Sequence, residues 1–334
     1  MTLRFRLTDD QRALRKGVRE LLARRFGREA LRAAVDAPGR LDRTLWRALG
    51  EAGFFALRLP EADGGVGLGL PEAVLVFEEA GRALLPGPLV ATHLAAGSVP
   101  GAAHGETVVA AVDGELAEWL DAADVVRGDA SGAVPLRSVD PLTPLHRVPA
   151  TRTDPWSALA GTGDVAAGTA EPVAGTGNPL AGVPGPSGGA SGALLGCPDP
   201  LAVLLTAAEQ LGTAGRVCEL AVEHARAREQ FGRPIGAFQA VQHLCADLLV
   251  RAETARAAVY AAAVTADPAD IAAARLLADE AAVRGARDCL QVHGGMGFTW
   301  EADVHLHLKR AWVRAWRAGG SARSEELLAA ALAG

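Results

Sequence analysis

Three glycines in four positions interrupt a helical pattern near the C-terminus, in the segment QVHGGMGFTW at residues 291–300. Glycine has no side chain and adopts positive φ without strain, so it lets the backbone approach a ligand closely. Gly294 can also end the preceding helix as its C-cap, and the two roles are compatible. The segment is not a GxGxxG sequence that follows a strand, which argues against a Rossmann or P-loop phosphate site.

A second segment suited to binding is REQFGRPI, residues 228–235, at the predicted end of a long helix. The planar guanidinium of Arg228 can form two charge-assisted hydrogen bonds with a phosphate group. An isolated arginine at a helix C-terminus can instead be a solvated side chain that the helix dipole favours. These residue types therefore indicate an anion site only if the rest of the chain supplies a matching scaffold.

Several other kinds of site and partner are excluded by composition. The four cysteines are widely spaced, with no CxxC or Cys/His ligand spacing, which indicates buried thiols in a reducing compartment and no metal site. The net charge of −6 argues against a nucleic-acid partner. No apolar stretch has the length of a membrane span or the pattern of a signal peptide, so we expect a cytoplasmic protein.

The elements that must position these segments are mostly helices. Hydrophobic residues make up 49% of the chain but aromatic residues only 4%, so Ala, Leu and Val must form close-packed helices. The 334 residues suit two or three domains. Thr8 and Gln11 form a predicted capping box at the first helix, and the Asp267-Pro268 pair begins a later one. Residues 1–98 are predicted to form an all-α domain.

Short β-type runs replace the helical pattern after this domain. ETVVAAVD, ADVVRG and AVPLRSV indicate a reduced middle β-domain over residues 99–156. Residues 157–198 are rich in Gly, Ala and Pro and have almost no large apolar side chain, which predicts a disordered linker. Residues 199–334 return to long helical patterns and predict a bundle of long helices with short connections.

In this order the segments resemble the acyl-CoA dehydrogenase family. The first helical domain is similar in LTDDQRALRKGVREL and LPEADGGVGLGL, and the bundle is similar in REQFGRPIGAFQAVQ and QVHGGMGFTWEADVHLHLKRA. The resemblance covers roughly residues 5–95 and 199–330. It implies a helical domain, a β-domain and a four-helix bundle, assembled as a dimer or a dimer of dimers. The family removes two hydrogens from the α and β carbons of an acyl-CoA thioester and uses FAD as the hydride acceptor.

The resemblance also assigns cofactor contacts to particular residues. In the family, the arginine-containing segment reaches across the dimer to the FAD diphosphate and adenine, and the glycine segment lies along the ADP portion of a neighbouring subunit's FAD. The residues implied here are Arg228, Gln230, Phe231, Gly232, Gln239, Gln291, Gly294 and Gly295.

The catalytic base that the resemblance implies is missing. The family's glutamate position corresponds to Ala318, and the earlier position used by some relatives corresponds to Ala202. Glu209 lies seven residues beyond Ala202, roughly 10 Å along a helix, and is expected to be a solvated acid or part of an ion pair. Asp303 and His305 could form a polar pair, although their spacing also suits an exposed helix face. The β-domain lacks the family's TEPxxGS and W[IV][TS][NS][GA] segments, which contact the flavin ring and the thioester.

Three functions remain open. The chain is expected to be a non-catalytic or partner-dependent subunit that completes the FAD site of a full-length paralogue, or of a homo-oligomer. Heteromeric members that act on steroid-side-chain thioesters have similar sequences around residues 298–311. The chain could instead be a self-sufficient FAD-dependent dehydrogenase with an unrecognised base, with electron-transfer flavoprotein as a possible electron acceptor. The third possibility is a flavin-free lyase, hydratase or interaction module on the same scaffold.

Overall fold

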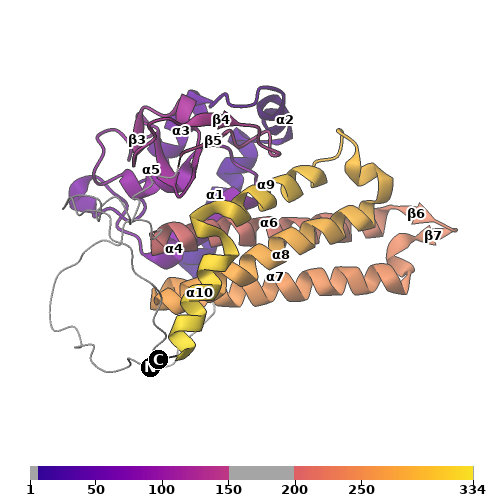
Figure 1. The fold of residues 1–334 in the computed structure, drawn as a ribbon. Helices are drawn as coiled ribbons and strands as arrows, with labels where there is room; N and C mark the ends of the chain where they lie inside the picture. Colours follow the sequence, from indigo (N-terminus) through magenta and orange to yellow (C-terminus); the bar gives the residue numbers. More distant parts are fainter. Residues whose placement is uncertain (1–6, 150–198, 334) are drawn as a thin grey trace, which may run out of the picture. The chain divides into compact units, whose positions relative to one another are not determined.

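The computed structural model describes residues 7–149 and 199–333, which belong to one compact unit (Figure 1). Along the sequence, one group of helices precedes a small sheet and a second group follows it. The first group is α1 (Asp9–Arg25), α2 (Arg28–Asp36), α3 (Arg43–Glu51), α4 (Leu70–Arg82) and α5 (Leu89–Ala95). The second is α6 (Pro200–Ala227), α7 (Gln239–Thr265), α8 (Pro268–His293), α9 (Val304–Trp316) and α10 (Gly320–Ala333). The mainly helical fold predicted from the sequence is confirmed.

Side-chain caps explain where several helices begin. The Thr8 hydroxyl accepts a hydrogen bond from the Gln11 backbone N–H at 3.1 Å, and the Gln11 side chain accepts one from the Thr8 N–H at 3.0 Å. This is the predicted capping box, and it satisfies two backbone donors at the start of α1. Asp267 caps α8 in a similar way, with Pro268 in the first turn as predicted.

A five-stranded sheet separates the two helical groups in the sequence. Its strands are β1 (Val109–Asp113), β2 (Leu116–Glu118), β3 (Val125–Arg127), β4 (Val134–Leu136) and β5 (Leu145–Arg147). Their order is β3-β1-β2-β5-β4, and only the β1–β3 pair is parallel. The three predicted β-type runs contain β1, β3 and β4. Strands β2 and β5 were not predicted, because their segments mix polar and apolar residues and show no β-type run.

The long helices α6, α7 and α8 pack side by side, and α9 and α10 pack against α8 (Figure 1). Helix α4 crosses α6 at very close range, because Gly81 and Gly212 meet there. A Cβ at Gly81 would overlap the backbone of Glu209, and a Cβ at Gly212 would overlap the carbonyl oxygen of Glu78. Glycine at both positions therefore allows the two helix backbones to touch.

Two local predictions need correction. Helix α6 ends at Ala227 rather than near Phe231, because Arg228 adopts an extended conformation. The hairpin β6 (Glu229–Gln230) and β7 (Arg233–Pro234) follows, and Phe231 and Gly232 turn it with φ of 55° and 76°. Helices α2 and α5 lie within the predicted all-α region, but neither was predicted individually. The proposed 157–198 linker and Cys197 lie outside the described residues.

None of the helices in residues 7–149 and 199–333 is both long and apolar enough to cross a bilayer. The same ranges contain no group of three or more His, Cys, Asp or Glu side chains placed to hold a metal ion. Cys218, Cys245 and Cys289 are free thiols on the three long helices.

Candidate functional site

The residues predicted to hold a nucleotide gather at one end of the helix bundle. Arg228 follows the last residue of α6, Gln239 begins α7, and Gln291 lies in the last turn of α8. The rings of His224 on α6 and His293 on α8 are stacked with centroids 4.1 Å apart, which fixes the two helix ends beside each other. The short helix η3 (Ile235–Ala237) leads from the hairpin into α7 and packs on α6.

All of the predicted cofactor residues are exposed in the single chain. They are Arg228, Gln230, Phe231, Gln239, Gln291, Gly294 and Gly295. Phe231 is 91% exposed at the tip of the hairpin. Within the described ranges, the Arg228 guanidinium makes no hydrogen bond or ion pair. An exposed aromatic ring and a cation without a partner are both available to a ligand or to another subunit.

The glycine segment also has an open face. Gly294 has a φ of 60° and follows α8 as its C-cap, with its N–H directed to the Gln291 carbonyl oxygen. A Cβ built at Gly294 or Gly295 would meet no atom within 4 Å. The capping role predicted from the sequence is therefore present, and the face left clear beside it can admit a ligand.

Neither position expected to carry the base has a carboxylate. Ala318 lies in the short helix η5 (Arg317–Gly319), which links α9 to α10, and Ala202 lies in the first turn of α6. The neighbouring Arg317 turns its guanidinium inward and is only 18% exposed. The contacts of this arginine show whether a free carboxylate is available as a base in this region.

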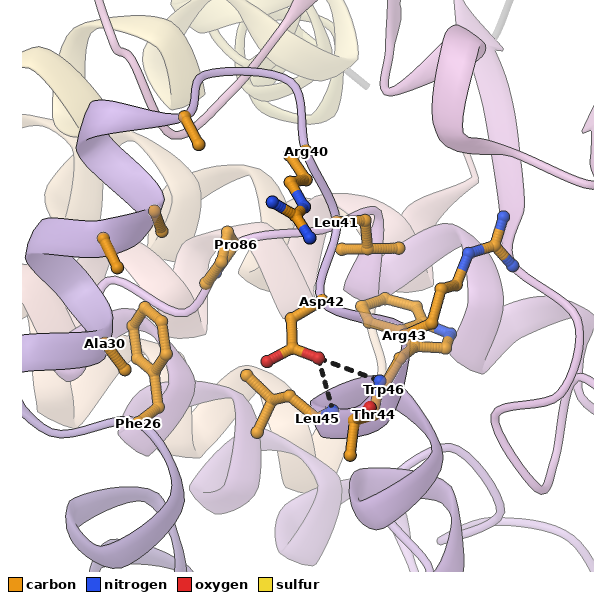
Figure 2. A pocket seen from close by; sticks show the side chains of 13 residues that line it. Phe26, Ala30, Arg40, Leu41, Asp42, Arg43, Thr44, Leu45, Trp46 and Pro86 are labelled. Carbon is orange, nitrogen blue, oxygen red and sulfur yellow. Dashed lines mark hydrogen bonds between the residues drawn. The ribbon is translucent and has the colours of Figure 1, made fainter.

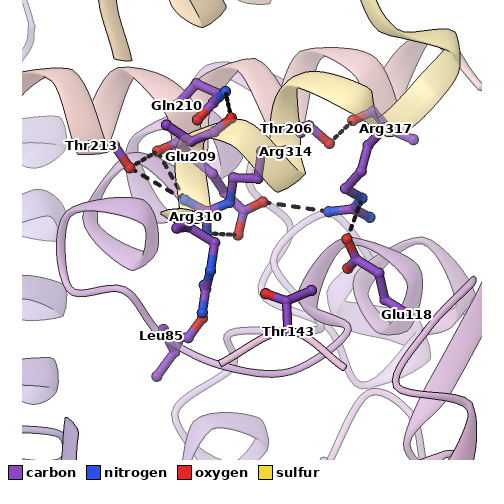
Figure 3. A network of polar contacts seen from close by, with 12 residues as sticks. Leu85, Glu118, Thr143, Thr206, Glu209, Gln210, Thr213, Arg310, Arg314 and Arg317 are labelled. Atoms are coloured by element: carbon purple, nitrogen blue, oxygen red, sulfur yellow. Dashed lines mark hydrogen bonds and ion pairs between the residues drawn. The ribbon is translucent and has the colours of Figure 1, made fainter. Parts of the chain in front are cut away.

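A network of buried ion pairs occupies this region (Figure 3). Arg317 contacts the Glu118 carboxylate of β2 at 3.1 Å and the Glu209 carboxylate of α6 at 3.8 Å. Arg314, one turn earlier on α9, contacts Glu209 at 2.9 Å. Arg310, a further turn back, pairs with Asp140 in the segment between β4 and β5. The network joins the sheet, α6 and α9, and most of its groups are almost fully buried.

The carboxylates singled out from the sequence, Glu209 and Asp303, are not free to act as a catalytic base, because each is held in an ion pair. Glu209 is 3% exposed, so the ion-pair alternative is correct and the solvated one is wrong. Glu219, a further acid on α6, pairs with Arg82 and Arg216. Asp303 pairs with Arg28 and Arg32 of α2 rather than with His305. His305 is buried against Trp300, so it does not belong to an exposed helix face.

A separate pocket of about 530 Å³ lies between α2 and α3 (Figure 2). Its floor is apolar, with Phe26, Leu45 and Trp46, and Arg40 stands at its edge. Asp42 lines it but is already used as the cap of α3, where it accepts from two backbone N–H groups at 2.9 and 3.1 Å. None of the predicted cofactor residues lines this pocket.

Comparison with known families gives a clear match to the two helical regions. Residues 8–108 match the profile described as "Acyl-CoA dehydrogenase, N-terminal domain", and residues 203–333 match "Acyl-CoA dehydrogenase, C-terminal domain". The chain belongs to the acyl-CoA dehydrogenase family. This confirms the resemblance seen in the sequence.

Individual members of the acyl-CoA dehydrogenase family are similar over nearly the whole chain. Acyl-CoA dehydrogenase IpdE2 of Mycobacterium tuberculosis is 38% identical over 329 residues, covering 91% of each chain. Among solved structures, the ChsE4-ChsE5 complex from Mycobacterium tuberculosis is 23% identical with a TM-score of 0.73, covering 99% of both chains. Butyryl-CoA dehydrogenase from Megasphaera elsdenii is 18% identical with the same TM-score, covering 99% of this chain and 100% of that one. These structures share the fold.

Membership of the acyl-CoA dehydrogenase family makes FAD the cofactor to test against these residues. The bundle end suits the diphosphate half, because it offers an exposed guanidinium at Arg228 and a glycine backbone with a clear face. The region next to Ala318 is different, because Arg317 and its partners occupy it. The chain therefore has donors suited to one half of the cofactor.

Glu118 is a buried acid that sequence reasoning missed. Burial raises the pKa of its carboxyl, although the Arg317 guanidinium beside it opposes the shift. A carboxyl with a raised pKa is typical of a catalytic acid or base, and also of a structural ion pair. In the sequence Glu118 lies within GELAEWLDA, where polar and apolar residues mix without a strand pattern. Only the fold shows that its side chain is largely buried, at 13% exposed, against Arg317 of η5.

The buried histidines beside this network should make stability depend on pH. Burial, followed by the nearby Arg216, Arg310 and Arg314 guanidiniums, lowers the pKa of His307 to about 3. The unfolded chain takes up a proton near pH 6.5 while the native chain does not, so stability falls as the pH drops below 6.5. We expect His307 alone to account for about 2 kcal/mol of lost unfolding free energy between about pH 6.5 and 5.

Urea unfolding at several pH values measures this effect. The variant His307→Gln should reduce the slope of unfolding free energy against pH by up to about 1.4 kcal/mol per pH unit, approached near pH 5. The matched control His243→Gln, on the exposed side of α7, should leave the slope unchanged. Equal slopes in all three proteins would show that His307 is not the titrating group.

Proposed function

We propose that this chain is a partner-dependent subunit of an acyl-CoA dehydrogenase. It completes an FAD site across an interface with a complete paralogue, and the paralogue supplies the catalytic base. The acyl-CoA thioester then binds in the paralogue's half of the assembly, and electron-transfer flavoprotein is a suitable electron acceptor. When bound, FAD accepts the hydride from the β carbon of the thioester.

The observation that carries this proposal is the ion-pair network beside Ala318. An α-proton can be removed only by a group that is both basic and within reach of the substrate. The two carboxylates described next to η5, Glu118 and Glu209, are bound to Arg317, and Glu209 is bound to Arg314 as well. A buried acid held between two guanidiniums stabilises the fold and is not placed to accept a proton from substrate.

The opposite end of the bundle has the properties of an interface. Phe231, Met296, Phe298 and Trp300 are large apolar side chains that are more than half exposed around the hairpin and the glycine segment. Exposed apolar groups clustered beside an unpaired cation are typical of a binding surface. A partner that covers these side chains would enclose the Arg228 guanidinium, where its hydrogen bonds to a diphosphate would be strongest.

The relatives are compatible with this assembly. The solved ChsE4-ChsE5 structure is described as a complex of two differently named chains, and its fold matches this chain over nearly its full length. That description supports a search for a second dehydrogenase chain as the partner.

Flavin content tests the proposal directly. Purified alone, the chain is expected to bind little FAD, whereas co-expression with a complete paralogue should give a yellow complex that contains fewer flavin molecules than protein chains.

In that complex Arg228→Ala should weaken FAD retention by about 1.5–3 kcal/mol, the scale of a charged hydrogen bond. Arg226→Ala, an exposed arginine in the last turn of the same helix, is the matched control and should have little effect. Stoichiometric FAD and turnover by the chain alone would contradict the proposal.

A self-sufficient dehydrogenase is the second candidate, and Glu118 is the observation that favours it. Its buried carboxyl lies beside η5, where the family places its base, and burial raises its pKa. This function requires the Arg317 ion pair to open when substrate binds. If the chain alone oxidises an acyl-CoA, Glu118→Gln should abolish that turnover while FAD stays bound.

A further inference from the structure

The pocket between α2 and α3 combines an apolar floor with a polar rim (Figure 2). Phe26, Leu45 and Trp46 form the floor, and all three side chains are buried. A second wall consists of alanines of α2, whose small side chains leave the space open. The volume of about 530 Å³ lies within the range of small-molecule sites, roughly 300–1,000 Å³.

Two charged side chains on the rim have binding capacity that the chain does not use. Arg40 lies in the segment between α2 and α3, and among the described residues its guanidinium has no hydrogen bond or ion pair. Asp42 caps α3 through Oδ1 alone, which accepts from the backbone N–H groups of Thr44 and Leu45. Its second oxygen, Oδ2, has no partner within the described ranges.

The other arginine of the rim is already engaged. Arg43 pairs with the Asp124 carboxylate and donates to the Ala122 carbonyl oxygen at 2.6 Å. Arg40 and Asp42 face the same space but do not pair with each other (Figure 2). The rim therefore offers one cation and one carboxylate oxygen, and a polar group can be seated between them.

These groups specify the chemistry of a ligand. A guanidinium binds a carboxylate, and a carboxylate oxygen accepts from an ammonium group. A fatty acid would satisfy Arg40 but would bring a like charge beside Asp42, and a simple amine would leave Arg40 without a partner. A molecule that carries both charges and an apolar group matches the rim and the floor together.

We propose that this pocket binds a free α-amino acid with a large apolar side chain. Its carboxylate binds Arg40, its ammonium group binds Asp42, and its side chain lies on the floor. The rings of Phe26 and Trp46 favour an aromatic side chain, because aromatic pairs gain from their contact beyond the area that they bury. This site goes beyond the proposed function, since it needs neither FAD nor a partner chain.

Titration calorimetry of the full chain with L-phenylalanine tests the site. We expect saturable binding of one molecule per chain. Phenethylamine lacks the carboxylate and 3-phenylpropionate lacks the ammonium group, and each should bind about tenfold more weakly or worse, because each loses a charged hydrogen bond.

Variants assign the two charges separately. Arg40→Ala should weaken phenylalanine binding about tenfold and leave phenethylamine binding unchanged. Asp42→Asn keeps a side chain that caps α3 well, but it should weaken phenylalanine binding to a similar extent and should not weaken 3-phenylpropionate binding. Arg47→Ala is the matched control, because Arg47 is an exposed arginine of α3 that does not line the pocket.

Circular dichroism and melting curves establish that each variant is folded. The inference would be overturned if phenylalanine showed no saturable binding, or if either analogue bound as tightly as phenylalanine. Wild-type affinity in folded Arg40→Ala or Asp42→Asn protein would overturn it as well, since the amino acid would then be held elsewhere.

Discussion

Replacing Glu209 with alanine should lower the free energy of unfolding by about 3–5 kcal/mol, the usual result of removing one partner from a buried ion pair. Glu209 is 3% exposed and contacts Arg314 at 2.9 Å. Without it, the contacts left to Arg314 among the described residues are the weaker ones to the Glu209 carbonyl oxygen and the Thr213 hydroxyl, both at 3.4 Å. A buried guanidinium would then lack its counter-charge.

Glu223→Ala is the matched control, because it removes the same residue type from the same helix. The Glu223 side chain is 63% exposed and its pair with Arg216 is a surface contact. We expect a loss of about 0–1 kcal/mol. Urea unfolding of both variants at neutral pH measures the difference. Similar losses in both would show that the network around Glu209 contributes no more than a surface ion pair.

Replacing Gly212 with alanine should also destabilise the fold strongly, by about 1–3 kcal/mol or more. The added Cβ would overlap the Glu78 carbonyl oxygen of α4 and would lie within 3 Å of the Arg82 backbone nitrogen. Backbone atoms of a buried helix cannot move aside as a flexible side chain can. The helices α4 and α6 would have to separate, and the core packed around their crossing would loosen.

The same substitution one turn later should have the opposite sign. A Cβ at Gly215 would meet only the end of the Arg256 side chain at 3.7 Å, an ordinary contact. Alanine is favoured over glycine in a helix by up to about 1 kcal/mol, so Gly215→Ala should be neutral or stabilising. Melting temperatures of the two variants measured side by side test this contrast. Destabilisation by both would mean that helix propensity and packing along α6 are not separable in this way.

Local signals explain what could be predicted of the fold. The Thr8–Gln11 box and the Asp267 cap each depend on residues close together in the sequence, and each is confirmed. Strands β2 and β5 were not predicted, because their residues show no β-type run and only their pairing with each other and with β1 and β4 defines them as strands. The end of α6 was placed too late because the helical composition continues into the hairpin.

The candidate site was also predicted only in part from the sequence, for the same reason. Arg228 and the glycine segment were identified because their motifs are contiguous, and the structure brings them to one end of the bundle. Their contacts with a cofactor remain a prediction. Glu118 and Arg317 are almost 200 positions apart, so no sequence pattern could show that they pair. The histidine pair was missed for the same reason, since His224 and His293 meet only when α6 and α8 pack.

The central position of α4 has a consequence for the order of folding during synthesis. The Glu78 carboxylate on this helix is 4% exposed in the native chain, and its partners Arg256 and Tyr260 follow 178 and 182 residues later on α7. At the usual 5–20 residues per second, the ribosome needs about 10–35 s to reach them. Until then, of its described native partners, Glu78 has only the more distant Arg15 of α1, at 3.8 Å. The N-terminal helices therefore reach their final packing only after most of the C-terminal bundle has been made.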